Sequence, residues 1–297
     1  MDNHTLDRQK PRREKGFWVA YLLLLPLFAL FSLFSYYPFL KTIINSFSVT
    51  TSTGEFIRGA GLENWKRVLS DAEFIKTFKN TFVFAILNFV MTFFPALFLA
   101  LLSTRKDRGS KWYQTLYSMP MAIAATVVAA IWRFILRSGD MGLLNQILGT
   151  DINWLKDKKY AMLALAVVSS WGHISGRYIY LMVGFRNVPS DLIEAATIDG
   201  AGWWTRTRKI MIPIASPQIF FVLFTSIIAS FKTFTQIKLL TGGGPAGATT
   251  TLMYSVYTKY NAGQIASSAC YALMLFAVIF VASRIQLRFE KKMVTYQ

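Results

Sequence analysis

Residues 80–104 have the sequence NTFVFAILNFVMTFFPALFLALLST, which contains no Asp, Glu, Lys or Arg. An α-helix needs roughly 20 predominantly apolar residues to cross the hydrocarbon core of a bilayer. This stretch exceeds that length, and no charged side chain interrupts it. It therefore predicts a transmembrane helix.

Five further blocks of the chain have the same character. Four of them also lack charged residues, and the fifth is interrupted only by Arg177. The five blocks are residues 17–40, 113–132, 160–185, 210–231 and 260–283. The chain is 54% apolar and 16% charged, whereas an ordinary soluble domain carries roughly 25% charged residues. Six such blocks leave too little polar surface for a soluble fold, so we predict an all-α integral membrane protein with six transmembrane helices.

Lys and Arg are unevenly divided between the segments that join these helices. One set of segments carries 17 of them and the other set carries 10. The richer set is 1–16, 103–112, 184–215 and 284–297, and the poorer set is 41–76, 137–159 and 239–266. By the positive-inside rule the richer set faces the cytoplasm, which puts both termini inside. The net charge of +17 then indicates contact with anionic membrane lipid rather than with nucleic acid.

This frame defines the expected organisation of the chain. A cytoplasmic tail, 1–16, precedes a transmembrane domain, 17–290, and a second cytoplasmic tail, 291–297, follows it. The expected helices are 17–40, 78–102, 113–136, 160–185, 214–238 and 262–286. A short interfacial helix is expected at 64–69 outside the membrane, a turn at 242–247, and a long cytoplasmic loop at 187–213.

All fifteen acidic residues fall in the loops and tails. Ion-coupled carriers usually keep a carboxylate at membrane depth, so its absence here counts against that class. With only His4 and His173 the chain has no histidine cluster for a metal. The run Gly242 to Gly247 has the glycine spacing of a phosphate-binding loop, but Ala248 stands where that motif requires Lys. We therefore expect no metal and no nucleotide in this chain.

The loop 187–213 carries strong signals for helix starts and stops. Ser190 is a plausible N-cap, and Asp191 and Glu194 follow it in the first turn, where acidic residues suit the helix dipole. Gly200 then ends this helix, and a second one leads to Pro213. The residues predict two short helices at an angle under the membrane. An amphipathic interfacial loop is the simpler interpretation of this pattern.

The residue spacing within this loop also matches a known pattern. Glu194-Ala195-Ala196 is followed by three residues, Gly200, nine residues, Ile210, one residue and Ile212-Pro213. This resembles the signature cytoplasmic loop of permeases in binding-protein-dependent ABC importers, with Ile212 in place of the usual Leu. The flanking Ile198-Asp199-Gly200-Ala201 and the outer Gly242-Gly243-Gly244-Pro245 resemble the carbohydrate-uptake branch, which includes permeases for maltose-type sugars and glycerol phosphate.

The resemblance implies a type I ABC importer permease fold and a non-catalytic role in the bacterial inner membrane. The chain would form half of a solute pathway with a second homologous permease subunit. Two separate ATPase subunits would bind ATP and Mg, and an extracytoplasmic solute-binding protein would deliver the solute. No cofactor is expected in this chain. The residues implied in ATPase coupling are Glu194, Ala195, Ala196, Asp199, Gly200, Ile210, Ile212 and Pro213.

Polar side chains in the fourth and fifth helices are candidates for the solute pathway. Ser169, His173 and Arg177 are spaced i, i+4, i+8, which places them on one helix face. Polar groups at membrane depth usually face the bundle interior or a cavity. The full candidate set is Ser169, Trp171, His173, Arg177, Ser230, Lys232, Thr233 and Gln236, with Trp171 as a platform for stacking a sugar. Alternatively, the Ser and Thr residues only join helices and Trp171 faces lipid.

The leading functional hypothesis is the import of a sugar or oligosaccharide. Arg177 and Lys232, two cations without a carboxylate, also suit an anionic sugar or a polyol phosphate, or they pair with backbone carbonyls or the partner permease. An ion-coupled secondary carrier or a channel is the alternative from another class, and a membrane enzyme is a third. Binding of an ATPase to the loop at 190–210 distinguishes the first hypothesis from the others.

Overall fold

The structure is a computed structural model that describes residues 17–105 and 110–294. These residues form helices and one short antiparallel hairpin. The all-α fold class predicted from the sequence is therefore confirmed. The predicted tail at 1–16 lies outside the described residues.

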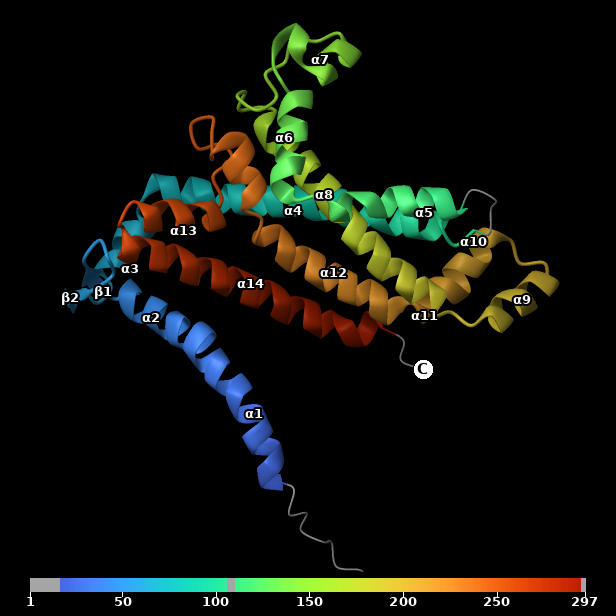
Figure 1. Cartoon of the computed structure of the whole chain (residues 1–297), viewed down its shortest axis with the longest axis horizontal. Coiled ribbons are helices and arrows are strands. Elements are labelled where there is room, and N and C mark those ends of the chain that lie inside the picture. Colours follow the sequence, from blue (N-terminus) through green and yellow to red (C-terminus); the bar gives the residue numbers. More distant parts are fainter. Residues whose placement is uncertain (1–16, 106–109, 295–297) are drawn as a thin grey trace, which may run out of the picture.

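Four helices run side by side along the long axis of the molecule (Figure 1). They are α4 (Ala72–Leu102), α8 (Ala161–Arg186), α12 (Ser216–Phe231) and α14 (Ile265–Met293). Helix α4 packs most extensively against α8, and α12 packs against α4, α8 and α14. The apolar cores between these helices hold the bundle together.

The connecting elements gather at the two ends of the bundle (Figure 1). At one end lie α9 (Ser190–Ile198), α10 (Trp203–Arg206) and the C-terminal end of α14. The opposite end holds β1 (Ser48–Thr50), β2 (Phe56–Gly59), α3 (Glu63–Leu69) and α13 (Leu252–Asn261). The described part of the basic segment 184–215 therefore lies at one end of the molecule and the segment 41–76 at the opposite end, whereas 137–159 lies at neither end (Figure 1).

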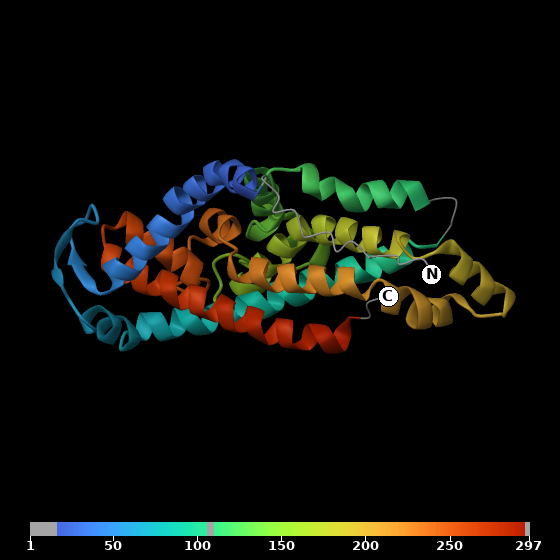
Figure 2. The ribbon, with the colours of Figure 1, turned by 90° about the horizontal axis from the view of Figure 1, so that it is seen from below.

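The N-terminal helical segment leaves the bundle. It consists of α1 (Phe17–Phe31), the π-helical turn η1 (Ser32–Tyr36) and α2 (Tyr37–Ser46). Helix α2 contacts α14, while α1 diverges from the other helices (Figures 1 and 2). The most apolar part of this segment has no buried residue within the subunit. Its surface is therefore available to lipid or to another subunit.

Three of the described helices are long and apolar enough to cross a membrane unbroken, and they span Tyr21–Ser46, Ala72–Leu102 and Ile265–Glu290. Two bent helix pairs raise the number of spans to five if each pair crosses once. Helix α8 corresponds to the fourth predicted span, 160–185; it has 26 residues, but Gly172, His173, Gly176 and Arg177 lower its hydropathy. The count of six spans therefore stays a prediction.

The third predicted helix, 113–136, is wrong as a single helix. The chain instead forms α5 (Ser110–Ser118), the 3-10 turn η2 (Met119–Ala122) and α6 (Ala125–Ile135). The two parts meet at an angle of 103°. Pro120 lies at this break, where it lacks the N–H that a continuing α-helix requires. The segment then extends through η3 (Gly139–Met141) and α7 (Leu143–Leu148), which project from the bundle (Figure 1).

The fifth predicted helix, 214–238, is also interrupted. Helix α12 ends at Phe231, and helical structure resumes only at Thr235, leading into the π-helical turn η5 (Ile237–Thr241). Three other boundaries differ by six or seven residues. Helix α4 begins at Ala72 instead of residue 78, the first helical segment continues to Ser46 instead of residue 40, and the last helix continues to Met293 instead of residue 286. A helix is present where 64–69 predicts one, as α3, and its interfacial position stays a prediction.

The glycine-rich segment after η5 forms the expected turn. Gly242, Gly243 and Gly247 have positive φ values of 58°, 81° and 71°, a backbone region that favours glycine. Helix α4 holds this turn from the side: Lys76 donates a hydrogen bond to the Ala246 carbonyl, and Asn80 Nδ2 donates to the Gly247 carbonyl at 2.8 Å. The outer turn is therefore attached to the longest helix of the bundle.

Helices α8 and α12 approach closely at Gly184. A Cβ atom added at this position would lie 2.6 Å from Gln218 Cβ and 3.7 Å from Ala215 Cβ. Gly176, two turns earlier on α8, has no atom within 4 Å of the equivalent position. Small residues allow such close approach of helices in membranes, where van der Waals packing drives association.

We predict that Gly184→Ala destabilises the folded subunit by about 1–3 kcal/mol, because the added methyl group overpacks the α8–α12 contact. Gly176→Ala is the matched control and is expected to be neutral or slightly stabilising, since alanine favours helix. Thermal unfolding of the two purified variants in detergent measures the difference. Equal unfolding temperatures would contradict the packing described here.

Candidate functional site

The cytoplasmic loop folds as the sequence predicts, into two short helices separated by a glycine. Helix α9 ends where Gly200 adopts a φ of +78°, and the Ala201 N–H donates to the Ala196 carbonyl at 2.9 Å. Helix α10 starts after Gly202, which has an ordinary φ of −65°. The expected N-cap is displaced by one residue, because Pro189 occupies the cap position and Ser190 is the first helical residue. Gly200 is thus the residue that sets the angle between the helices.

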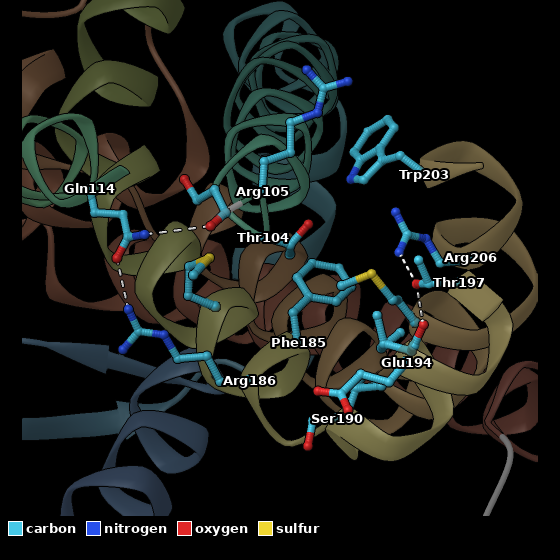
Figure 3. Close-up of a pocket in the computed structure, with 15 residues that line it drawn as sticks. Thr104, Arg105, Gln114, Phe185, Arg186, Ser190, Glu194, Thr197, Trp203 and Arg206 are labelled. Carbon is cyan, nitrogen blue, oxygen red and sulfur yellow. Dashed lines mark hydrogen bonds between the residues drawn. The ribbon is translucent and has the colours of Figure 1, made fainter. Parts of the chain in front are cut away.

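A hydrogen bond ties the two short helices together. The Arg206 guanidinium on α10 donates to the Thr197 hydroxyl on α9 (Figure 3). The Arg105 guanidinium at the end of α4 lies 4.6 Å from the centre of the Trp203 ring. The loop is therefore braced both internally and against the neighbouring helix bundle.

Apolar side chains are exposed on the surface of the loop. Ile198 is 87% exposed and Trp204 is 61% exposed, and Leu192 is exposed as well. Glu194, Ala195, Asp199 and Gly200 are also exposed. Large apolar residues grouped with polar ones on a water-facing surface are typical of a protein interaction site.

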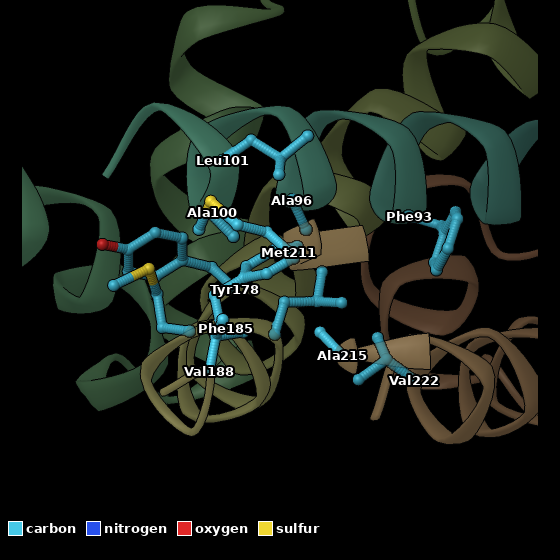
Figure 4. Packing of buried hydrophobic residues seen from close by; sticks show 12 residues of the cluster. Phe93, Ala96, Ala100, Leu101, Tyr178, Phe185, Val188, Met211, Ala215 and Val222 are labelled. Carbon is cyan, nitrogen blue, oxygen red and sulfur yellow. The ribbon is translucent and has the colours of Figure 1, made fainter. Parts of the chain in front are cut away.

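The C-terminal part of the signature motif faces inward instead. Ile210 and Ile212 pack against a buried cluster that includes Ala96, Ala100 and Phe185. Figure 4 shows Met211 and Ala215, from the same segment, within this cluster. Pro213 lies in the short helix α11 (Ile212–Ile214) that leads to α12. The motif therefore divides into an exposed half, from Glu194 to Gly200, and an anchoring half, from Ile210 to Pro213, with Ala196 between exposure and burial.

A second polar feature is a cavity of about 410 Å³ at the interruption of α12. Residues 232–236, which form and follow the interruption, all line it. Irregular backbone at membrane depth is tolerated where it is buried in protein or lines a cavity, and solute sites of transporters are often formed by such discontinuous helices. The interrupted segment after α12 therefore forms part of the cavity wall.

Four of the eight predicted pathway residues line this cavity: His173, Lys232, Thr233 and Gln236. Two others lie near it in the hydrogen-bond network. Ser169 Oγ is 3.4 Å from His173 Nδ1, and Arg177 Nε donates to Ser226 Oγ at 3.3 Å. The described cavity wall contains no carboxylate, so Lys232 is its charged group.

The remaining two predicted residues are packed away from the cavity. Ser230 is buried; its hydroxyl accepts from Asn88 Nδ2 at 3.0 Å and donates to the Ser226 carbonyl at 2.9 Å. Trp171 packs edge-on against Trp132, with ring centres 6.0 Å apart. The hydrogen bonds of Ser230 fit the helix-joining role that the sequence left open as an alternative. For Trp171, sugar stacking and a position facing lipid both stay predictions.

Some residues at the cavity were not identified from the sequence. Thr225 and Ala125 line it, and Phe234 supplies an aromatic surface there. The Phe234 ring lies 4.8 Å from the ring of Tyr257 on α13, and Lys238 Nζ donates to the Tyr257 hydroxyl at 2.7 Å. This hydrogen bond lowers the pKa of Tyr257. The helix break at 232–234 has no proline or glycine to mark it, so no sequence signal pointed to Phe234.

Comparison with protein families identifies a match over most of the chain. Residues 96–295 match the family described as "Binding-protein-dependent transport system inner membrane component". Among curated proteins, the sn-glycerol-3-phosphate transport system permease protein UgpA of Yersinia pestis is 34% identical over 285 residues, covering 94% of this chain and 96% of that protein. The protein of the same name from Pectobacterium atrosepticum is 32% identical over 288 residues, covering 95% and 97%.

Comparison with solved structures gives the same fold. A chain of a bacterial ABC transporter involved in the import of the acidic polysaccharide alginate matches with a TM-score of 0.81 and 20% identity, covering 94% of this chain and 96% of that chain. A chain of an amino acid ABC transporter matches with a TM-score of 0.54 and 16% identity, covering 77% of this chain and 97% of that one. The predicted type I importer fold is confirmed.

We predict that Gly200→Ala loosens the junction between α9 and α10, because a Cβ at a φ of +78° costs about 1 kcal/mol. Gly202→Ala is the matched control, since Gly202 has a φ of −65° and nothing lies within 4 Å of an added Cβ. Amide hydrogen exchange of residues 197–206 is expected to accelerate in the first variant only. Equal acceleration in both variants would show that Gly200 does not set this angle.

Proposed function

Since the chain belongs to the family of binding-protein-dependent transport system inner membrane components, we propose that its exposed loop couples separate ATPase subunits to a solute pathway at the α12 break. Family membership makes the chain a permease subunit of a bacterial ABC importer and a non-catalytic component of the inner membrane. The ion-coupled carrier, the channel and the membrane enzyme therefore no longer apply.

The proposed assembly contains this chain, a second homologous permease, two ATPase subunits that hold ATP and Mg, and an extracytoplasmic solute-binding protein. The orientation places both termini and the loop 187–213 in the cytoplasm. The Lys and Arg bias supports this orientation, because the described parts of the basic segments 103–112 and 184–215 lie at the α9–α10 end of the molecule. The unburied α1 offers an apolar surface that suits the second permease as well as lipid.

The observation that carries the coupling proposal is the exposed apolar surface of α9 and α10. Ile198 and Trp204 are exposed where a cytoplasmic ATPase would dock, and Ala195 leaves room for close packing. We assign Glu194 a pairing role with a basic residue of the ATPase. Because Ile210 and Ile212 are packed in the bundle core, displacement of the docked loop would be transmitted to α8 and α12. Differential stabilisation of two conformations by ATP would then drive transport.

For the solute we infer an anionic polyol or sugar derivative, in preference to the neutral oligosaccharide that led the sequence interpretation. Lys232 projects from the wall of a cavity without a described carboxylate, and Arg177 lies nearby on α8, bonded to Ser226. The relatives named above as sn-glycerol-3-phosphate permeases are 32% and 34% identical over nearly the whole chain. We assign His173, Lys232, Thr233 and Gln236 to solute contact, and Ser169 and Arg177 to the surrounding network.

The docking proposal predicts ATP-dependent co-purification of an ATPase and a second permease with the tagged wild-type chain. Glu194→Lys and Gly200→Trp are expected to reduce ATPase recovery at least tenfold, since a charge reversal and a bulky ring disrupt a packed interface. Glu55→Lys, an equal charge reversal in the exposed outer hairpin, is the control and should retain the ATPase. Undiminished recovery with both loop variants would refute docking at α9.

The solute proposal predicts that the reconstituted importer transports sn-glycerol 3-phosphate in preference to a neutral disaccharide. Lys232→Gln is expected to raise the KM for the phosphate ester roughly tenfold, because a charge-assisted hydrogen bond is lost, and Arg177→Gln is expected to act in the same direction. Lys156→Gln, which removes an exposed outer lysine, is the control. Transport of the neutral sugar alone, with no effect of Lys232→Gln, would restore the oligosaccharide hypothesis.

A further inference from the structure

A second cavity lies beside the cytoplasmic loop, away from the proposed solute pathway. Its volume is about 850 Å³. One side is formed by the adjoining ends of α4, α5 and α8, and the other side by α9 and α10 (Figure 3). It therefore separates the membrane helices from the loop that is proposed to dock the ATPase.

The charged groups that line this cavity are predominantly hydrogen-bond donors. Arg105, Arg186 and Arg206 come from three different helices or their ends, and Glu194 is the carboxylate among the described lining residues. A guanidinium carries five N–H donors and no acceptor. The cavity therefore presents an excess of positive charge and of unused donors.

Two of the guanidinium groups are held in place by neutral partners. Arg186 Nη2 donates to Gln114 Oε1 at 2.7 Å, and Arg206 donates to the Thr197 hydroxyl. Each of these bonds uses one N–H and leaves the positive charge uncompensated. Both arginines are thus oriented without being neutralised.

The side chains of Arg105 and Trp203 have fewer hydrogen-bond partners than those of Arg186 and Arg206. The Arg105 guanidinium lies over the Trp203 ring and forms no side-chain hydrogen bond or ion pair with the described residues. Stacking on an aromatic ring leaves the N–H groups at the guanidinium edge free to bind an anion. The Trp203 Nε1–H is buried and has no acceptor within the described part of the chain. A buried donor without an acceptor costs free energy, which a ligand oxygen would recover.

We propose that this cavity binds a phosphate group, held by Arg105 and Arg206 and by the Trp203 N–H, while Arg186 adds positive charge to the opposite wall (Figure 3). The forked donors of arginine match the geometry of phosphate oxygens. On the proposed orientation, the cavity lies at the cytoplasmic face, where anionic phospholipid headgroups are abundant. A free phosphate or phosphomonoester offers the same chemistry from solution. The proposal rests on the proposed function only for this orientation.

The bound phosphate would connect two parts of the subunit. Arg105 follows α4, whereas Arg206 belongs to α10. An oxyanion shared by these two side chains would hold the loop against the end of α4. It would add to the contact that Arg105 already makes with Trp203, and it is distinct from the solute cavity.

The test uses the purified importer complex and two probes. Native mass spectrometry counts the phosphatidylglycerol molecules retained in detergent, and thermal unfolding of the delipidated complex follows a titration with inorganic phosphate. Arg105→Gln and Arg206→Gln are each expected to weaken binding roughly three- to tenfold, and Trp203→Phe about threefold. Glu194→Gln is expected to strengthen it by a similar factor, since a carboxylate repels the anion.

The control is Arg208→Gln, which removes the same charge two residues from Arg206 on an exposed side chain outside the cavity. It should leave binding unchanged. A response with phosphatidylglycerol alone identifies a lipid headgroup, and a response with phosphate alone identifies a soluble ligand. Both results support the site.

The proposal is overturned if Arg208→Gln weakens binding as much as Arg206→Gln, or if Arg105→Gln and Trp203→Phe change neither probe. Arg105→Gln breaks no hydrogen bond of the described structure, so its result does not depend on how Arg206→Gln folds. ATPase recovery is measured on the same samples. Loss of the assembly and loss of phosphate binding are therefore separate outcomes.

Discussion

The hydrocarbon interior of a membrane offers no hydrogen-bond partner to the polypeptide backbone, so each N–H and C=O must find one within the protein. This constraint explains why the long blocks of apolar sequence are helices. It also restricts where the helices can be interrupted. The break after Phe231 lies in a segment that lines a cavity, where irregular backbone is tolerated. The same constraint thus produces both the bundle and its candidate solute site.

Close helix contact gives the bundle its shape. Ala96 and Ala100 on α4 are fully buried against the segment around Phe185 and Met211, and Gly184 allows α8 to approach α12. Met211 of the loop belongs to this packed region, and Ile210 and Ile212 pack against it. The anchoring half of the loop is therefore packed with the bundle core, and the exposed half, from Glu194 to Gly200, is attached to it.

Much of this organisation follows from the sequence, because hydropathy and charge bias are strong, local signals. The uncharged block at 80–104 identified α4, and Gly200 with Gly202 located the break in the loop. The bend near Pro120 and the interruption at Lys232 to Phe234 were missed, although the uncharged block ends at Phe231 and Lys232 follows it. A single proline or lysine does not show by itself that a helix is broken there. Spacing on one helix face made Ser169, His173 and Arg177 pathway candidates, and His173 lines the cavity at the α12 break. The stacking role suggested for Trp171, which packs against Trp132, stays a prediction. Contacts between helices determine where a helix is interrupted and what a side chain packs against, and the sequence of one helix does not show these contacts.

The length of helix α4 has a consequence for how the two ends of the bundle are connected. The helix contains 31 residues, which at 1.5 Å each make a rod of about 46 Å. Near one end, Lys76 and Asn80 donate hydrogen bonds to the glycine turn. Near the other end, Ala96 and Ala100 belong to the buried cluster that anchors the loop 187–213. A single helix thus connects the two ends of the bundle, and Pro95, near its C-terminal end, removes one backbone hydrogen bond from it.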